Sequence, residues 1–168
     1  DLNIVQQRGL SVVTNPASNL KLASGIAPIS EMLRRGINIG IGTDGPASNN
    51  CLDMFREMFL VTGLAKVREK NAAAVSADDV LRMATIGGAK AMNLPRCGTI
   101  QEGQLADLIV IDLDQPNMQP LNNIAKNIVY AGSKQNVLLT MINGVIRYER
   151  GEFHIGTDPE EIYATAQE

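Results

Sequence analysis

Asp44 is the acidic residue whose surroundings most favour a chemical role. It lies in the stretch N-I-G-I-G-T-D-G-P-A-S-N-N, residues 38–50, after a short apolar run broken by two glycines. Glycine in a strand marks a bend or a close backbone approach, and in parallel α/β folds the carboxyl ends of the strands carry binding and catalytic groups. Asp44 is therefore a candidate working carboxylate. Asp-Gly is also an ordinary turn signal, and this stretch alone favours the turn.

A second polar segment, residues 15–25, precedes Asp44. It reads N-P-A-S-N-L-K-L-A-S-G after a β-rich run at 10–14, and its composition predicts a loop. Ser18 and Asn19 could equally serve its turns and caps or contribute to a site. A helix is predicted from Pro28 to near Gly36, and a strand at 37–41 follows. The order strand, loop, helix, strand, loop predicts parallel strands. Their two loops would then lie at the same end of the sheet.

A long helix is predicted after the Asp44 loop, from residue 52 to about residue 70. Either Asn49 or Asn50 is expected to cap it. Its apolar stripe should face the core and consists of Leu52, Phe55, Phe59 and Val67.

A further helix is predicted at residues 77–92, behind a capping box formed by Ser76 and Asp79. Gly87 and Gly88 lie inside it, and a helical glycine costs about 1 kcal/mol relative to alanine. Two small residues at this cost predict close packing against a neighbouring element.

After Pro95 the sequence pattern changes from helices to short strands separated by turns. Strands are predicted at residues 108–113, 128–131, 137–142 and 145–148. Asn143-Gly144, between the last two, is a type I′ hairpin signal, and Thr157-Asp-Pro-Glu160 begins a short terminal helix. The predicted organisation is an α/β unit at 1–94, a β-rich unit at 95–157 and a C-terminal helix at 158–168.

Composition excludes several classes of protein. A hydrophobic content of 45% over 168 residues predicts a globular core. The net charge of −3 and the absence of a large basic patch argue against nucleic acid as a partner. Apolar runs fall short of the roughly 20 residues of a membrane helix. Two cysteines, without the spacing of a disulfide framework or a zinc site, suit a reducing, cytoplasmic location.

Together these segments resemble the amidohydrolase superfamily, in particular the deaminases of S-adenosylhomocysteine and 5′-methylthioadenosine. The resemblance rests on N-P-A-S-N-L-K-L-A-S-G-I-A-P at 15–28 and G-T-D-G-P-A-S-N-N at 42–50, and it continues at 81–85, 87–89 and 103–112. It implies an α/β fold: the C-terminal part of a TIM (β/α)8 barrel at 1–94 and part of a small β-sandwich at 95–157. Because two long motifs occur in this order, the resemblance favours a working carboxylate at Asp44 over a plain turn.

The resemblance also implies residue roles. Such enzymes hold a divalent metal, commonly zinc, with an His-x-His pair, a later His and an Asp, which Asp44 matches. Asp44 would thus be a metal ligand and a catalytic proton carrier, beside a metal-bound hydroxide that attacks the adenine ring and releases ammonia. Ser48 matches a substrate-binding serine. Chlorohydrolase or guanine-deaminase specificity remains open, because specificity residues of the family lie largely upstream.

The sequence departs from the family in its histidines. It has only His154, which has the setting of a surface residue, and Thr14 stands where many relatives have His. Catalytic zinc takes about three protein ligands, so the chain alone is expected to bind no metal and to be inactive. It begins with Asp1 rather than Met, and we expect a C-terminal fragment whose exposed strand edges need the N-terminal part of the barrel or self-association. A non-catalytic structural or assembly subunit is the alternative.

Overall fold

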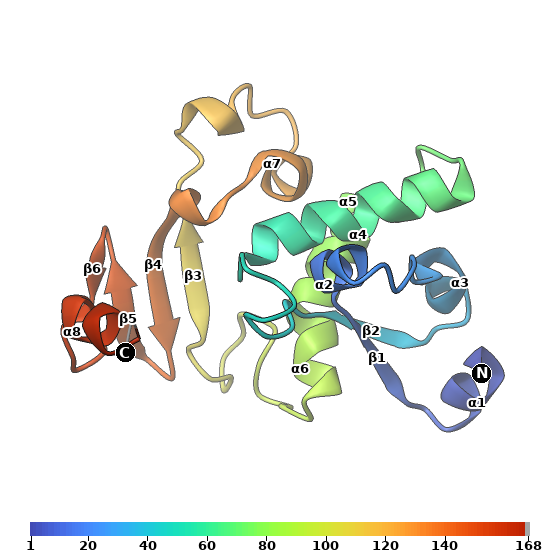
Figure 1. Cartoon of the computed structure of the whole chain (residues 1–168), viewed down its shortest axis with the longest axis horizontal. Coiled ribbons are helices and arrows are strands. Elements are labelled where there is room, and N and C mark those ends of the chain that lie inside the picture. Colours follow the sequence, from blue (N-terminus) through green and yellow to red (C-terminus); the bar gives the residue numbers. More distant parts are fainter. Residues whose placement is uncertain (167–168) are drawn as a thin grey trace.

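Two parallel strands, β1 (Ser11–Thr14) and β2 (Asn38–Ile41), form the centre of the N-terminal part of the computed structural model, which describes residues 1–166 (Figure 1). Ser11 pairs with Asn38 and Thr14 with Ile41. The helix α1 (Leu2–Gln7) precedes β1, and α2 (Pro16–Lys21) and α3 (Ile29–Arg34) connect the strands. The predicted parallel order is confirmed, so the segments after β1 and β2 begin at the same end of the sheet.

Residues 16–21 form the helix α2, although the sequence predicts a loop there. Pro16 occupies the first helical position, where its fixed φ suits the helix and its missing N–H removes no hydrogen bond. Ala17 and Ser18 are buried, and α2 packs against α4. Ser and Asn lower local helix propensity, and tertiary packing overrides that preference here.

The long helix α4 (Met54–Glu69) is confirmed, but its cap and its buried face differ from the prediction. Asp53 caps it, because its carboxylate accepts a 2.9 Å hydrogen bond from the N–H of Phe55. Of the predicted stripe only Phe55 is buried, whereas Leu52, Phe59 and Val67 are exposed. The buried hydrophobic side chains are Phe55, Met58, Val61 and Ala65. Because α4 carries apolar residues on more than one face, periodicity could not select the face that packs.

The predicted helix at 77–92 is observed as α5 (Ala77–Arg82), a π-helical turn η1 (Met83–Gly87) and α6 (Gly88–Ala91) in succession. Ser76 and Asp79 form the predicted capping box. A Cβ atom at Gly87 would overlap the carbonyl oxygen of Ile39 on β2. The predicted close packing at the glycine pair is therefore confirmed, and it brings this helix directly onto the strand.

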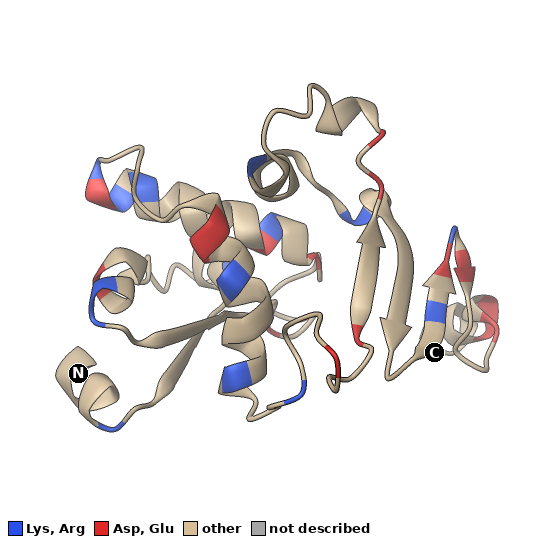
Figure 2. Cartoon of the chain, turned by 180° about the vertical axis from the view of Figure 1, so that it is seen from behind, with Lys and Arg blue, Asp and Glu red and all other residues tan. Residues whose placement is uncertain are grey.

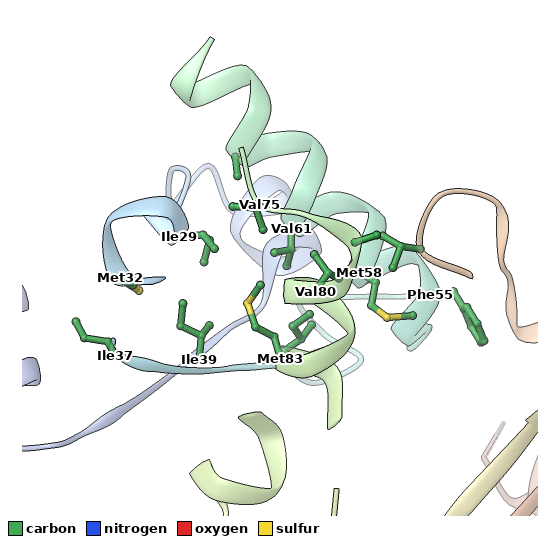
Figure 3. Close-up of a cluster of buried hydrophobic side chains, with 14 residues drawn as sticks. Ile29, Met32, Ile37, Ile39, Phe55, Met58, Val61, Val75, Val80 and Met83 are labelled. Atoms are coloured by element: carbon green, nitrogen blue, oxygen red, sulfur yellow. The ribbon is translucent and has the colours of Figure 1, made fainter. Parts of the chain in front are cut away.

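The hydrophobic core lies between β2, α4 and the helix that begins with α5 (Figure 3). Its labelled side chains include Ile39 from the strand, Val61 from α4 and Met83 from η1, and Ile29 and Met32 join them from α3. The strand that delivers Asp44 is thus held by apolar contacts over its length. Removal of this apolar surface from water is the main stabilising term for the arrangement.

The C-terminal part contains an antiparallel sheet of order β3 (Leu108–Ile111), β4 (Val137–Ile142), β5 (Val145–Glu149) and β6 (Glu152–Phe153). Asn143 and Gly144 both have positive φ, so the predicted hairpin between β4 and β5 is confirmed. The terminal helix α8 (Pro159–Thr165) is capped by Asp158. The predicted helix extends to residue 168, and its last two residues lie outside the described part of the chain.

Residues 128–131 do not form the predicted strand. They belong to the helix α7 (Ile124–Ala131), which Asn123 caps by accepting a 2.9 Å hydrogen bond from the N–H of Lys126. The 3₁₀ turns η2 (Pro116–Met118) and η3 (Lys134–Asn136) flank it. A short apolar run suits a strand and a buried helix equally. Val129 lies in the same core cluster as Phe55 of α4, so this tertiary contact favours the helix.

Charged residues are dispersed over both parts of the chain, without one extended region of a single sign (Figure 2). None of the described helices combines the length and the apolar character that crossing a bilayer requires. The division of the chain near Leu94 stays a prediction.

Candidate active site

Asp44 lies in the loop that follows β2, and its carboxylate is held from two sides. The Ser18 hydroxyl, on α2, donates a 2.7 Å hydrogen bond to Oδ2, and the N–H of Gly45 donates a 2.7 Å hydrogen bond to Oδ1. The structure therefore brings together the two loop segments that the strand order placed at one end of the sheet. Of the two uses foreseen for Ser18, turn or site, the structure shows a contact with the candidate carboxylate.

The backbone of Asp44 has a φ of 59°. This left-handed conformation is uncommon for residues other than glycine, although Asp and Asn tolerate it better than most. Non-glycine residues keep such a conformation only where the surrounding structure enforces it. The two hydrogen bonds to the carboxylate are part of that enforcement.

The electrostatic surroundings keep Asp44 ionised. The Ser18 hydroxyl is the strongest cause that holds its pKa below the usual value, followed by the Ser48 hydroxyl and the Gly45 N–H. The side chain is exposed, and each oxygen accepts one protein hydrogen bond, so lone pairs of both oxygens are left for a cation, a water or a substrate. An ionised, presented carboxylate can bind a cation or accept a proton.

Ser48 lies in the same loop and is half-buried. Its hydroxyl donates a 3.2 Å hydrogen bond to the carbonyl oxygen of Gly45, and the N–H of Asn49 donates to the same oxygen at 2.9 Å. Ser48 therefore stabilises the turn after Asp44, and turning the same hydroxyl toward the carboxylate would lower the pKa of Asp44. Its role in binding substrate stays a prediction.

Sequence reasoning missed two side chains that brace this loop. The Lys21 ammonium donates to the Ala47 carbonyl at 3.0 Å and to Asn50 Oδ1 at 2.6 Å, which links α2 to the loop. Glu57, on α4, is completely buried beneath it. The available signal was a charged residue between the apolar Phe55 and Met58.

The donor set fits only part of a metal site. A carboxylate such as Asp44 is a suitable ligand for a divalent cation, and a catalytic zinc takes about three protein ligands. Among the described residues, no group of three or more His, Cys, Asp or Glu side chains is placed to hold a metal ion. His154 is exposed and follows β6, and Thr14 is buried at the end of β1. Asp44 thus fits one ligand position of such a site.

A carboxylate presented where parallel strands end is the arrangement of α/β enzymes. The model of the amidohydrolase family matches residues 1–147, and this chain belongs to that family. The family resemblance inferred from residues 15–28 and 42–50 is confirmed.

Relatives of known structure and sequence agree with this assignment. The 5-methylthioadenosine/S-adenosylhomocysteine deaminase of Lawsonia intracellularis is 46% identical over 153 residues, which are 91% of this chain and 35% of the relative. An adenosine deaminase from Xanthomonas campestris, with bound zinc, superposes with a TM-score of 0.95 at 40% identity, over 99% of this chain and 38% of that one. Atrazine chlorohydrolase from Arthrobacter aurescens, complexed with zinc, gives a TM-score of 0.91 at 28% identity, over 99% and 37%. The chain therefore spans little more than a third of these relatives.

Proposed function

We propose that this chain is the C-terminal portion of a metal-dependent aminohydrolase that deaminates an adenosine derivative such as S-adenosylhomocysteine or 5′-methylthioadenosine. The observation that carries the proposal is the Asp44 carboxylate, which accepts a hydrogen bond from Ser18 and is presented where two parallel strands end. Identity of 46% to the Lawsonia deaminase, against 28% to the chlorohydrolase, favours deamination over chlorohydrolase chemistry. A guanine-type substrate is a weaker candidate.

In this proposal Asp44 is one ligand of a divalent metal, zinc by analogy with the zinc-containing neighbours. A metal held there would supply water activated for attack near neutral pH. The lone pairs of Asp44 that Ser18 and Gly45 leave free would accept the proton of the attacking water and pass it toward the leaving amine. Ser48, four residues further on, would contact the substrate.

The remaining metal ligands would come from further barrel strands. Val13, in the middle of β1, is 51% exposed and Leu10 is 52% exposed. Parallel strands are normally covered on both faces, so this exposure supports residues 1–94 acting as the last strand–helix units of a (β/α)8 barrel. Residues 95–157, with their four-stranded antiparallel sheet, would be part of a β-sandwich. We favour the rest of the amidohydrolase barrel as the part that covers these exposed side chains. Self-association of a non-catalytic subunit is the alternative.

The direct test uses the complete protein that carries this chain. Asp44→Ala should abolish ammonia release from S-adenosylhomocysteine and lower the bound zinc measured by mass spectrometry. Asp114→Ala, a matched change at an exposed carboxylate in the C-terminal part, should leave both unchanged. Full turnover in the Asp44→Ala protein would refute the role assigned to Asp44.

A second experiment separates an enzyme portion from an assembly subunit. The purified 168-residue chain should contain no stoichiometric zinc and should show no deaminase activity, whereas the complete protein should show both. Comparison of the intact mass of the natural product with the length of its gene would show whether an upstream part is joined to this chain. A natural product of 168 residues, without metal in any assembly, would support the structural subunit instead.

A further inference from the structure

Glu57 is an acidic side chain in a place where an apolar one would be expected. It lies in the first turn of α4 with no exposed surface, and it is the only buried acidic side chain among the described residues. No ion pair within the described part of the chain involves it. Burial of a carboxylate without a cationic partner is costly, so its neighbours must provide compensating hydrogen bonds.

Both oxygens of Glu57 accept hydrogen bonds, and the two donors come from different segments, the helix α2 and the loop after β2. Oε2 accepts from the backbone N–H of Ala17 at 3.0 Å, and Oε1 accepts from Nδ2 of Asn49 at 2.8 Å. Ala17 is in the first turn of α2, where backbone N–H groups have no partner inside the helix. Partial positive charge at the starts of α2 and α4 further favours a carboxylate at this point.

These contacts lead to Asp44 by two routes. Ala17 precedes Ser18, whose hydroxyl donates to Asp44 Oδ2. Asn49 Nδ2 also donates a 2.8 Å hydrogen bond to the carbonyl oxygen of Thr43, the residue before Asp44. Glu57 therefore holds both the helix that supplies the donor to Asp44 and the backbone that carries Asp44.

We propose that Glu57 is a positioning residue, which fixes the candidate metal-site carboxylate by joining the start of α2 to the loop after β2. The closed set of hydrogen bonds explains how Asp44 keeps its left-handed backbone in an exposed loop. Its catalytic meaning rests on the function proposed above for Asp44. The geometric part, that Glu57 sets the conformation of the Asp44 loop, is independent of it.

The hydrogen-bond pattern requires a carboxylate. Asn49 Oδ1 already accepts from the N–H of Cys51 at 3.1 Å, so the Asn49 amide cannot turn over without losing that contact. Glu57→Gln keeps the size of the side chain, but its amide has one acceptor for two donors. One N–H group must then face another, whichever way the amide is oriented.

The matched control is Thr62→Val on the same helix. Thr62 is also completely buried, and its hydroxyl donates a 2.8 Å hydrogen bond to the Val75 carbonyl, away from the Asp44 loop. Both substitutions remove hydrogen bonds from buried groups and should lower the melting temperature. Only Glu57→Gln removes hydrogen bonds that connect to the Asp44 loop.

The first measurement uses NMR on the metal-free 168-residue chain. Glu57→Gln should change the chemical shifts of Asp44 and Ser18, and it should speed hydrogen exchange of the Asn49 backbone amide by about tenfold or more relative to the control. That amide donates to Gly45, next to Asp44, and so reports the loop. Wild-type shifts and exchange at these positions in Glu57→Gln would overturn the proposal.

The second measurement uses the complete protein. Glu57→Gln should lower kcat by about ten- to hundredfold, as expected for displacement of a catalytic group, with a much smaller change in KM. Thr62→Val, compared at a temperature where both proteins are folded, should keep kcat within about twofold of wild type. Equal kcat values for the two variants would overturn the positioning role.

The two results together distinguish the possible failures. If Glu57→Gln disturbs the Asp44 loop but Asp44→Ala keeps full turnover, the proposed function fails and the geometric role of Glu57 stands. If Asp44→Ala is inactive and Glu57→Gln keeps both the loop and kcat, the proposed function stands and the positioning role fails.

Discussion

The hydroxyl of Ser18 and the carboxylate of Asp44 meet across the ends of two neighbouring strands, with 2.7 Å between Oγ and Oδ2. The two residues are 26 positions apart, and they belong to the helix after β1 and the loop after β2. This contact is the strongest cause of the lowered pKa of Asp44. It also turns two separate sequence motifs into one site.

The first prediction concerns this contact. Ser18→Ala should raise the pKa of Asp44 toward its ordinary value, because the largest stabilising partner of the ionised form is lost. A ¹³C NMR titration of the Asp44 carboxyl carbon in the metal-free chain measures the change. Ser30→Ala is the control, since the Ser30 hydroxyl has no hydrogen-bond partner among the described residues. A titration in Ser18→Ala identical to that of the wild type would contradict the assignment.

The lowered pKa of Asp44 also makes the stability of the fold depend on pH. A carboxylate with a depressed folded-state pKa stabilises the fold above its unfolded-state pKa, and the contribution is lost as pH falls through the folded-state value. The Ser18→Ala protein should therefore melt below the wild type near neutral pH, and part of that difference should vanish in strong acid.

The second prediction contrasts adjacent glycines. Gly87→Ala should destabilise the chain by about 1–3 kcal/mol or more, because the new Cβ meets the backbone carbonyl of Ile39 and neither backbone can easily move. Gly88→Ala meets no atom closer than 3.8 Å, and it should stabilise the helix by up to about 1 kcal/mol. Urea unfolding of the two variants measures both free energies. A loss at Gly88 as large as that at Gly87 would show that local propensity, not contact with β2, sets the requirement.

The third prediction concerns the Cys97 thiol, whose pKa is raised chiefly by its hydrogen bond to Asp107 at 3.3 Å. Asp107→Asn should lower that pKa and speed alkylation by iodoacetamide at pH 8, because the thiolate is the reactive form. The asparagine can still accept the hydrogen bond from the Asn143 N–H through Oδ1. Rates would be measured by mass spectrometry in a Cys51→Ser background.

Asp112→Asn is the matched control for this measurement, since the Asp112 carboxylate bonds Gln115 and the Asp114 N–H instead. Its alkylation rate should equal that of the parent. An unchanged rate in Asp107→Asn would mean that burial alone protects the thiol.

The sequence by itself determined the features that depend on a few adjacent residues. The Asn143-Gly144 turn requires positive φ at both positions, and the capping box joins Ser76 to a residue three positions away. The parallel order of β1 and β2 followed from the alternation of strand and helix signals. The motif around Asp44 was likewise readable, and with it the family.

Only the tertiary structure decided which of several locally acceptable arrangements is used. Residues 16–21 are helical because they pack on α4, and residues 124–131 are helical because Val129 reaches the core. The buried face of α4 could not be chosen from a helix that is apolar on more than one side. The partnership of Ser18 with Asp44, and of Glu57 with Ala17 and Asn49, depends on contacts between residues 8 to 40 positions apart. Local propensity carries no information on such contacts, because packing of the whole chain decides which distant donors reach one carboxylate.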